Sequence, residues 1–361
     1  MRLFGLLGSL LGGLFAAGSA RAVGLPEDLA EAMLHVYNSG GVTASGPALL
    51  VRKSIADKVS LTGTYYADIV SNASIDVVTT ASPYKETRNA FGLGMNVAVR
   101  DTLITLVAAS SREPDYVADA VNLDLAQDVF GGMTTLALGF TRGSDKVGKT
   151  GTAGYFDSAD HWRYRLGATQ ILTPTWLMTA NFEAISDSGY LGNPYRVAYV
   201  FGAAVPESVP RTRTSRALQV RAVGDLGERN VVVGIYRYFW DTWGITAHTA
   251  EAGYSRYFGD AWLANAFVRY HAQQGALFYS DNATADTTYV SRNRQLSTFD
   301  DVGLGATISY TAVKPGGPYG VTLTGGIEAV RFNYSNFTDI RTGKLYSFDA
   351  VLGQLLVSVT F

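Results

Sequence analysis

Apolar and polar side chains alternate along most of this chain. In the segment after Thr175, the apolar residues Trp176, Met178 and Phe182 fall on alternate positions, and the positions between them are mostly Thr, Asn and Glu. Successive side chains of a β-strand point to opposite faces of the sheet. The segment is therefore predicted to be a strand with one apolar and one polar face.

The same alternation recurs at 162–169, 218–222, 262–271, 301–310 and 351–361, and helical periodicity is scarce. The polar faces consist mainly of Thr, Ser, Asn and Gly with scattered Arg. The solvent face of a soluble β-sandwich would be richer in Lys and Glu. An apolar outer face and a polar inner face instead predict an all-β fold, a single transmembrane antiparallel β-barrel.

The connections between these segments fall into two classes. Turn-forming residues mark tight connections at 56–57, 100–101, 130–132, 173–175, 224–230, 258–260 and 315–317. Longer connections alternate with them, at 68–86, 143–159, 187–212, 275–297 and 333–345, and two further exposed hairpin tips, near 113–114 and 241–242, are short. This predicts about 16 strands, within a range of about 14–18, with short periplasmic turns and long extracellular loops. Only 24–37 is ambiguous, because 26–35 also fits a short periplasmic helix.

The two ends of the chain predict export to the outer membrane. Met1 and Arg2 precede an apolar run that ends in the small-residue site Ala20-Arg21-Ala22, which is typical of a signal peptide over residues 1–22. The barrel would then occupy residues 23–361. No later segment approaches the roughly 18 apolar residues of a membrane-spanning helix. The last alternating segment ends on Phe361, which resembles the signal read by the barrel assembly machinery.

Composition narrows the possible functions. The chain has 17% charged residues, 21 Tyr, 39 Gly and no Cys. Without cysteine, disulfides, thiolate zinc sites and iron–sulfur clusters are excluded. The net charge of -2 shows no basic bias, so no nucleic-acid partner is expected.

A family resemblance covers nearly the whole mature chain. Its most specific part is the run Ser-Ile-Asp-Val-Val-Thr-Thr-Ala-Ser-Pro-Tyr at 74–84, and shorter matches lie at 46–53, 128–131, 192–196 and 210–215. In these segments the sequence resembles the bacterial outer-membrane family called domain of unknown function 3570. The resemblance implies an outer-membrane barrel without an established activity. It also implies a link to extracytoplasmic redox proteins, which in a chain without cysteine would be indirect.

Eight residues are candidates for the lumen or a constriction. Arg163, Arg165, Arg221 and Arg269 lie on polar strand faces, and Glu183 is a possible ionic partner for them. Salt bridges that hold the wall together are the alternative interpretation, and mixed signs argue against strong ion selectivity.

Three of the eight candidates lie in or beside the predicted loops. The loop at 68–86 contains apolar Ile75, Val77 and Val78, so it either folds inward as a constriction or extends the neighbouring strands. Asp76 and Tyr84 are the candidates there. Arg196 belongs to the long connection 187–212, which would reach the lumen or bind an anionic surface sugar.

Catalytic and metal chemistry has little support in the sequence. The four histidines lack the spacing of paired metal ligands on a strand or a helix. Asp160-His161 and Asp300-Asp301 resemble the rim residues of barrel proteases, but adjacent strand residues point to opposite faces. We therefore assign no catalytic residue, no metal and no cofactor.

The sequence thus predicts a porin-like outer-membrane channel for small hydrophilic solutes. The alternative is a non-conducting envelope scaffold or anchor that binds a partner protein through its loops. The other expected partners are outer-membrane lipid, lipopolysaccharide and, through Phe361, the barrel assembly machinery.

Overall fold

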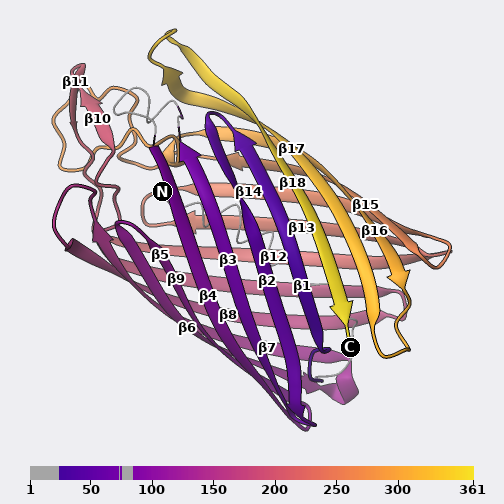
Figure 1. The fold of residues 1–361 in the computed structure, drawn as a ribbon. Helices are drawn as coiled ribbons and strands as arrows, with labels where there is room; N and C mark the ends of the chain where they lie inside the picture. Colours follow the sequence, from indigo (N-terminus) through magenta and orange to yellow (C-terminus); the bar gives the residue numbers. More distant parts are fainter. Residues whose placement is uncertain (1–23, 73, 75–83) are drawn as a thin grey trace.

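A computed structural model describes residues 24–72, 74 and 84–361 of the chain. Sixteen antiparallel strands form one closed barrel, and two further strands form a small hairpin outside it. Figure 1 shows the strands running obliquely around the barrel, with the β10–β11 hairpin at one end. The predicted fold class and strand number are confirmed.

The strands of the first half are β1 (Leu29–Ser39), β2 (Val42–Ala56), β3 (Val59–Asn72), β4 (Tyr84–Val99), β5 (Thr102–Glu113), β6 (Tyr116–Val129), β7 (Thr134–Gly148), β8 (Tyr155–Thr173) and β9 (Trp176–Gly189). Those of the second half are β10 (Val197–Val200), β11 (Ala203–Pro206), β12 (Thr212–Gly227), β13 (Asn230–Asp241), β14 (Thr246–Phe258), β15 (Trp262–Gln273), β16 (Phe299–Val313), β17 (Gly320–Asp339) and β18 (Lys344–Thr360). Two short 3-10 turns, η2 (Phe130–Gly132) and η3 (Arg294–Leu296), complete the described elements.

Pairing of the first strand with the last closes the barrel. The β1–β18 register runs without interruption from Leu29 opposite Thr360 to Ser39 opposite Ala350. Both ends of the described chain therefore lie at the end of the barrel where every connection is short, whereas the opposite end carries the long connections 190–211 and 274–298. We take that end as periplasmic, because single-chain barrels have short turns on that side and longer loops outside.

The two faces of the wall differ as the alternation predicts. Large apolar side chains such as Leu34, Leu93, Leu166 and Leu355 are exposed on the outside, where a bilayer would cover them. Outward-facing aromatic residues near the periplasmic turns, among them Trp262 packed against Tyr310 at a tilt of 37°, resemble the aromatic girdle of membrane barrels. No helix of the described residues is long and apolar enough to cross a membrane.

The structure corrects several predicted loop boundaries. Residues 29–39 form β1, which decides the strand-or-helix ambiguity in favour of a strand. The predicted long loop at 333–345 is wrong, because β17 continues to Asp339 and β18 begins at Lys344. The resulting hairpin projects well beyond the barrel rim (Figure 1). Strands β3 and β7 also extend further than predicted, to Asn72 and Gly148.

The close approach of β2 to β3 depends on one glycine. The regular β2–β3 register lapses at Gly46 and Pro47, where proline has no N–H to donate. A Cβ placed on Gly46 would lie 1.9 Å from the backbone oxygen of Ala67. We expect Gly46→Ala to destabilise the barrel by about 1–3 kcal/mol, as overpacking commonly does. The readout is the urea midpoint of the folded-to-unfolded gel shift.

Gly63→Ala is the matched control for this substitution. It lies on neighbouring β3, and a Cβ there would meet nothing within 4 Å. Equal midpoints for the two variants would contradict the close approach.

Candidate functional site: the lumen and its extracellular cap

Two ion pairs on the inner wall each cross a strand at a glycine. Arg165 on β8 binds Asp124 on β6 at 2.5 Å and Asn122 at 2.9 Å. Between them on β7 is Gly139, where a Cβ would lie 2.5 Å from Asp124 Oδ1 and 2.7 Å from Arg165 Nε. The pair can therefore form because the intervening strand has no side chain at this level.

The second pair repeats this arrangement on the other side of the barrel. Arg269 on β15 reaches Glu328 on β17 at 3.1 Å and Asp301 on β16 at 3.8 Å. Gly303 on β16 lies beneath it, since its Cβ would be 3.4 Å from Glu328 Oε1 and 3.5 Å from Arg269 Nη2. This part of the wall is held by a buried triad of one cation and two carboxylates.

Other lumen arginines are less tightly held. Arg163 Nε lies 3.5 Å from Glu183 Oε2, so these two predicted candidates do meet. Arg221 and Arg237 have no ion pair within the described part of the chain. Arg237, which was not among the residues predicted from the sequence, stands opposite Gln219, two residues from Arg221 on β12. These two guanidinium groups are available to an anionic group in the lumen.

Two histidines are engaged by carboxylates. His161 contacts Asp187 through Nδ1 at 2.6 Å and Asp145 through Nε2 at 2.7 Å, so neither nitrogen is free to act on a solute. His35 Nε2 contacts Asp68 at 2.7 Å and the Tyr66 hydroxyl at 3.1 Å. Across the described residues, no three His, Asp or Glu side chains form a metal-binding group.

Each of the adjacent polar pairs is divided between the two faces, as the period of two predicts. His161 faces the lumen, whereas Asp160 binds Arg142 at 2.7 Å on the outside. Asp301 faces Arg269 in the lumen, whereas Asp300 accepts a hydrogen bond from Asn333. Neither pair brings its two polar side chains together, so neither forms a protease-like site.

Two long loops interlock at the extracellular end and form a cap. The cap comprises residues 190–211, which include β10 and β11, and residues 274–298. Their backbones exchange hydrogen bonds between Tyr199 or Phe201 and Ala283, and between Ser208 and Val290. Trp243, from the β13–β14 turn, is buried against Ala276 and Leu296 of the second loop.

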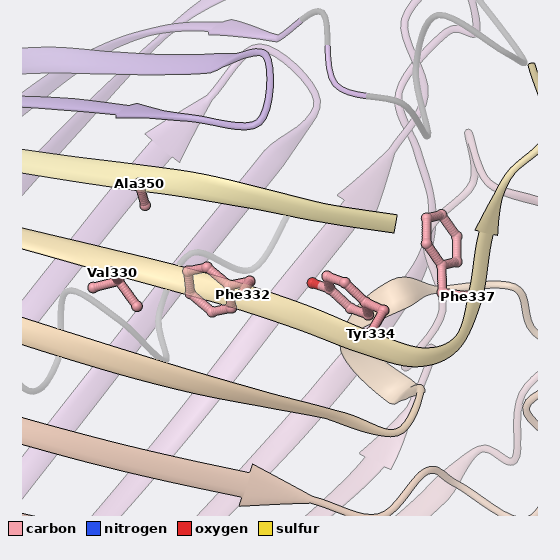
Figure 2. Close-up of a cluster of buried hydrophobic side chains, with 5 residues drawn as sticks. All are labelled: Val330, Phe332, Tyr334, Phe337 and Ala350. Atoms are coloured by element: carbon pink, nitrogen blue, oxygen red, sulfur yellow. The ribbon is translucent and has the colours of Figure 1, made fainter. Parts of the chain in front are cut away.

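An aromatic cluster on the last hairpin anchors the cap. Figure 2 shows Val330, Phe332 and Tyr334 along β17, with Phe337 further along the same hairpin. Arg292 of the cap lies over the Phe337 ring at 4.4 Å, forms an ion pair with Asp281 at 2.8 Å and donates to the Thr338 carbonyl at 2.5 Å. The second loop of the cap is thereby fixed to β17.

The structure places none of the three loop candidates among the lumen side chains described above. Asp76 and the side chain of Tyr84 lie outside the described residues, although Tyr84 begins β4. Arg196 is not on the barrel wall: it lies in the cap, 3.8 Å from Glu207. The sequence predicted only a long loop at 275–297, because the contacts that anchor this loop come from strands distant in the chain.

Removal of Arg269 should destabilise the barrel strongly. Its side chain and those of Asp301 and Glu328 are at most 16% exposed, so Arg269→Ala leaves two buried carboxylates without a cation. We expect a loss of about 3 kcal/mol in urea unfolding of the refolded barrel.

The control for this prediction is Arg331→Ala. Arg331 pairs with Asp349 on the outer face, where the side chains are 50% and 69% exposed. Its loss should cost less than about 1 kcal/mol, and a similar cost for both variants would argue against the buried triad.

Solved structures share the barrel fold. A bacterial polysaccharide outer membrane secretin matches with a TM-score of 0.52 and 8% identity, covering 93% of this chain and all 100% of that one. OpdK of Pseudomonas aeruginosa, solved with vanillate, matches with a TM-score of 0.46 and 10% identity over 92% of this chain and 97% of its own. At these identities the similarity concerns the fold alone.

The siderophore receptor PirA of Pseudomonas aeruginosa is a longer chain. It matches with a TM-score of 0.44 and 13% identity over 91% of this chain, which spans 63% of the PirA chain.

The closed barrel and its apolar exterior place the protein in the bacterial outer membrane.

A search of the curated proteins found no match. The model of a family of proteins of unknown function, DUF3570, matches residues 61–328. That match covers well over half of the chain and includes strands β4 to β16 entire. The chain belongs to this outer-membrane barrel family.

Proposed function

We propose that the protein is a channel for small hydrophilic solutes across the outer membrane. The observation that carries the proposal is the polar inner wall of a barrel of 16 strands, a size at which barrels leave an aqueous lumen unless loops plug it. Interior hydrogen bonds link Thr, Asn and Gln side chains on neighbouring strands, for example Thr141 to Asn122 and Asn265 to Thr307. Such a surface favours water and polar solutes over lipid.

The two free lumen arginines give the channel a point of contact for anionic groups. Arg221 and Arg237 lie on adjacent strands β12 and β13, beside a wall where most other charges are paired. Paired charges contribute little net field, so unpaired guanidinium groups weigh more on ion passage. The proposed channel therefore has a weak preference for solutes that carry a carboxylate or phosphate.

Neutralising these arginines should reduce the passage of anions. We expect Arg221→Gln with Arg237→Gln to raise the cation-to-anion permeability ratio by roughly twofold, measured as the reversal potential in a KCl gradient across a planar bilayer. Arg331→Gln, on the outer face, is the control and should leave the ratio unchanged. An unchanged ratio in the double variant would remove Arg221 and Arg237 from the solute path.

The cap is proposed to restrict the extracellular mouth. Arg292 joins the second loop to β17, so Arg292→Ala should loosen the cap and increase single-channel conductance by roughly twofold or more. Arg341→Ala removes a different contact, the ion pair with Asp339 at the hairpin tip, and should not change conductance. Equal conductance in the Arg292 variant and the wild type would show that the cap does not limit flow.

A non-conducting scaffold remains the second candidate. The observation that favours it is the exposure of Leu277 (84%) and Phe201 (70%) on the cap, since exposed apolar side chains on a loop surface suit a protein partner. A bilayer that stays silent with correctly folded protein would favour this function over the channel.

A further inference from the structure

The outer wall of the barrel carries a groove that the lumen does not explain. It spans strands β4 to β7 and has a volume of about 500 Å³, within the range of roughly 300–1,000 Å³ common for ligand sites. Phe91, Leu93 and Val121 form apolar walls around the small Ala108. These four side chains are exposed on the outer face, so the groove opens toward lipid.

Two cross-strand rows define the groove. The lower row pairs Leu93 with Ala108, Ala108 with Val121, and Val121 with Arg142. The upper row, two residues nearer the extracellular rim, comprises Ser110, Asp119, Ser144 and Asp160 as successive partners. An apolar slot therefore lies directly beneath a line of hydroxyls and carboxylates.

The upper row has unused hydrogen-bonding capacity. Ser110 Oγ is buried and has no hydrogen-bond partner within the described part of the chain, although buried polar atoms are normally paired. Asp119 is exposed and likewise has no ionic or hydrogen-bond partner there. Both residues line the groove, so a ligand seated in it would meet an acceptor and a hydroxyl at its head.

Arg142 supplies the cation of the site. Its guanidinium lies 4.0 Å from the Trp162 ring centroid and 2.7 Å from Asp160 Oδ1, which holds it beside the groove. Arginine binds phosphate through a planar set of donors, and one carboxylate contact leaves further donors available. A charged residue on the lipid face is tolerated near the membrane interface and not at the bilayer centre. The Arg142 guanidinium, which reaches up to Asp160, and the upper row therefore lie at headgroup level.

We propose that this groove binds one phosphorylated glycolipid of the outer leaflet. An acyl chain occupies the slot over Ala108, sugar hydroxyls donate to Asp119 and contact Ser110 and Ser144, and a phosphate lies against Arg142. Because surrounding lipid tails are as apolar as the slot, burial alone gives little selectivity. The upper row and Arg142 together therefore select the headgroup. The site is separate from the lumen, and the proposal stands whether or not the barrel conducts.

The test uses the refolded mature barrel in phosphatidylethanolamine nanodiscs supplemented with purified lipid A, a phosphorylated and acylated diglucosamine. After mild detergent extraction, native mass spectrometry counts the lipid retained per barrel. The wild type should retain one lipid A in preference to phosphatidylethanolamine. Ala108→Phe should fill the slot and lower retention by roughly tenfold, and Asp119→Asn should lower it less, without a change in shape.

Ala252→Phe is the matched control. Ala252 is an exposed, outward-facing alanine on β14, far around the barrel from the groove, and its substitution should leave retention unchanged. Heat-dependent gel migration confirms that each variant is folded. Undiminished retention in both the Ala108 and Asp119 variants would overturn the proposal, as would equal retention of phosphatidylethanolamine by the wild type.

Discussion

The structure depends on one constraint: no backbone N–H or C=O group can remain unpaired in the hydrocarbon core of a membrane. An open sheet would leave two unpaired edges. The pairing of β1 with β18 along its whole length removes both. Closure in turn assigns every side chain of the wall to lipid or to lumen, so the alternation along each strand follows from it.

Because closure imposes this alternation, the features that follow from the alternation could be predicted from the sequence. The period of two revealed the barrel, the approximate strand number and the division of pairs such as Asp160 and His161 between the faces. It also placed Arg163, Arg165, Arg221 and Arg269 on polar faces. Ion pairs between neighbouring strands, such as Arg163 with Glu183, can be predicted once the order of the strands is known.

The features that could not be predicted from the sequence depend on contacts between segments that are distant in the chain. Phe332 and Tyr334 continue the alternation of β17, but the segment 333–345, which starts directly after Phe332, was predicted to be a loop. Arg196 was expected either to reach the lumen or to bind an anionic surface sugar, and the structure places it in the cap, 3.8 Å from Glu207. Gly139 and Gly303 allow ion pairs to cross a strand. A glycine at a lumen-facing position, with opposite charges on the strands at either side, is the sequence feature that marks such a pair. The outer groove depends on registers among four strands, which no local pattern reveals.

The anchoring of the cap has a consequence for the order of assembly. Arg292 and Phe337 join a loop that precedes β16 to the hairpin between the last two strands, and β18 is the strand that seals the seam with β1. The cap loop can therefore settle only when the C-terminal hairpin has reached its final position. Until then Arg292 lacks its contacts with the Phe337 ring and the Thr338 carbonyl, which makes a protease-resistant cap a sign that biogenesis of the barrel is complete.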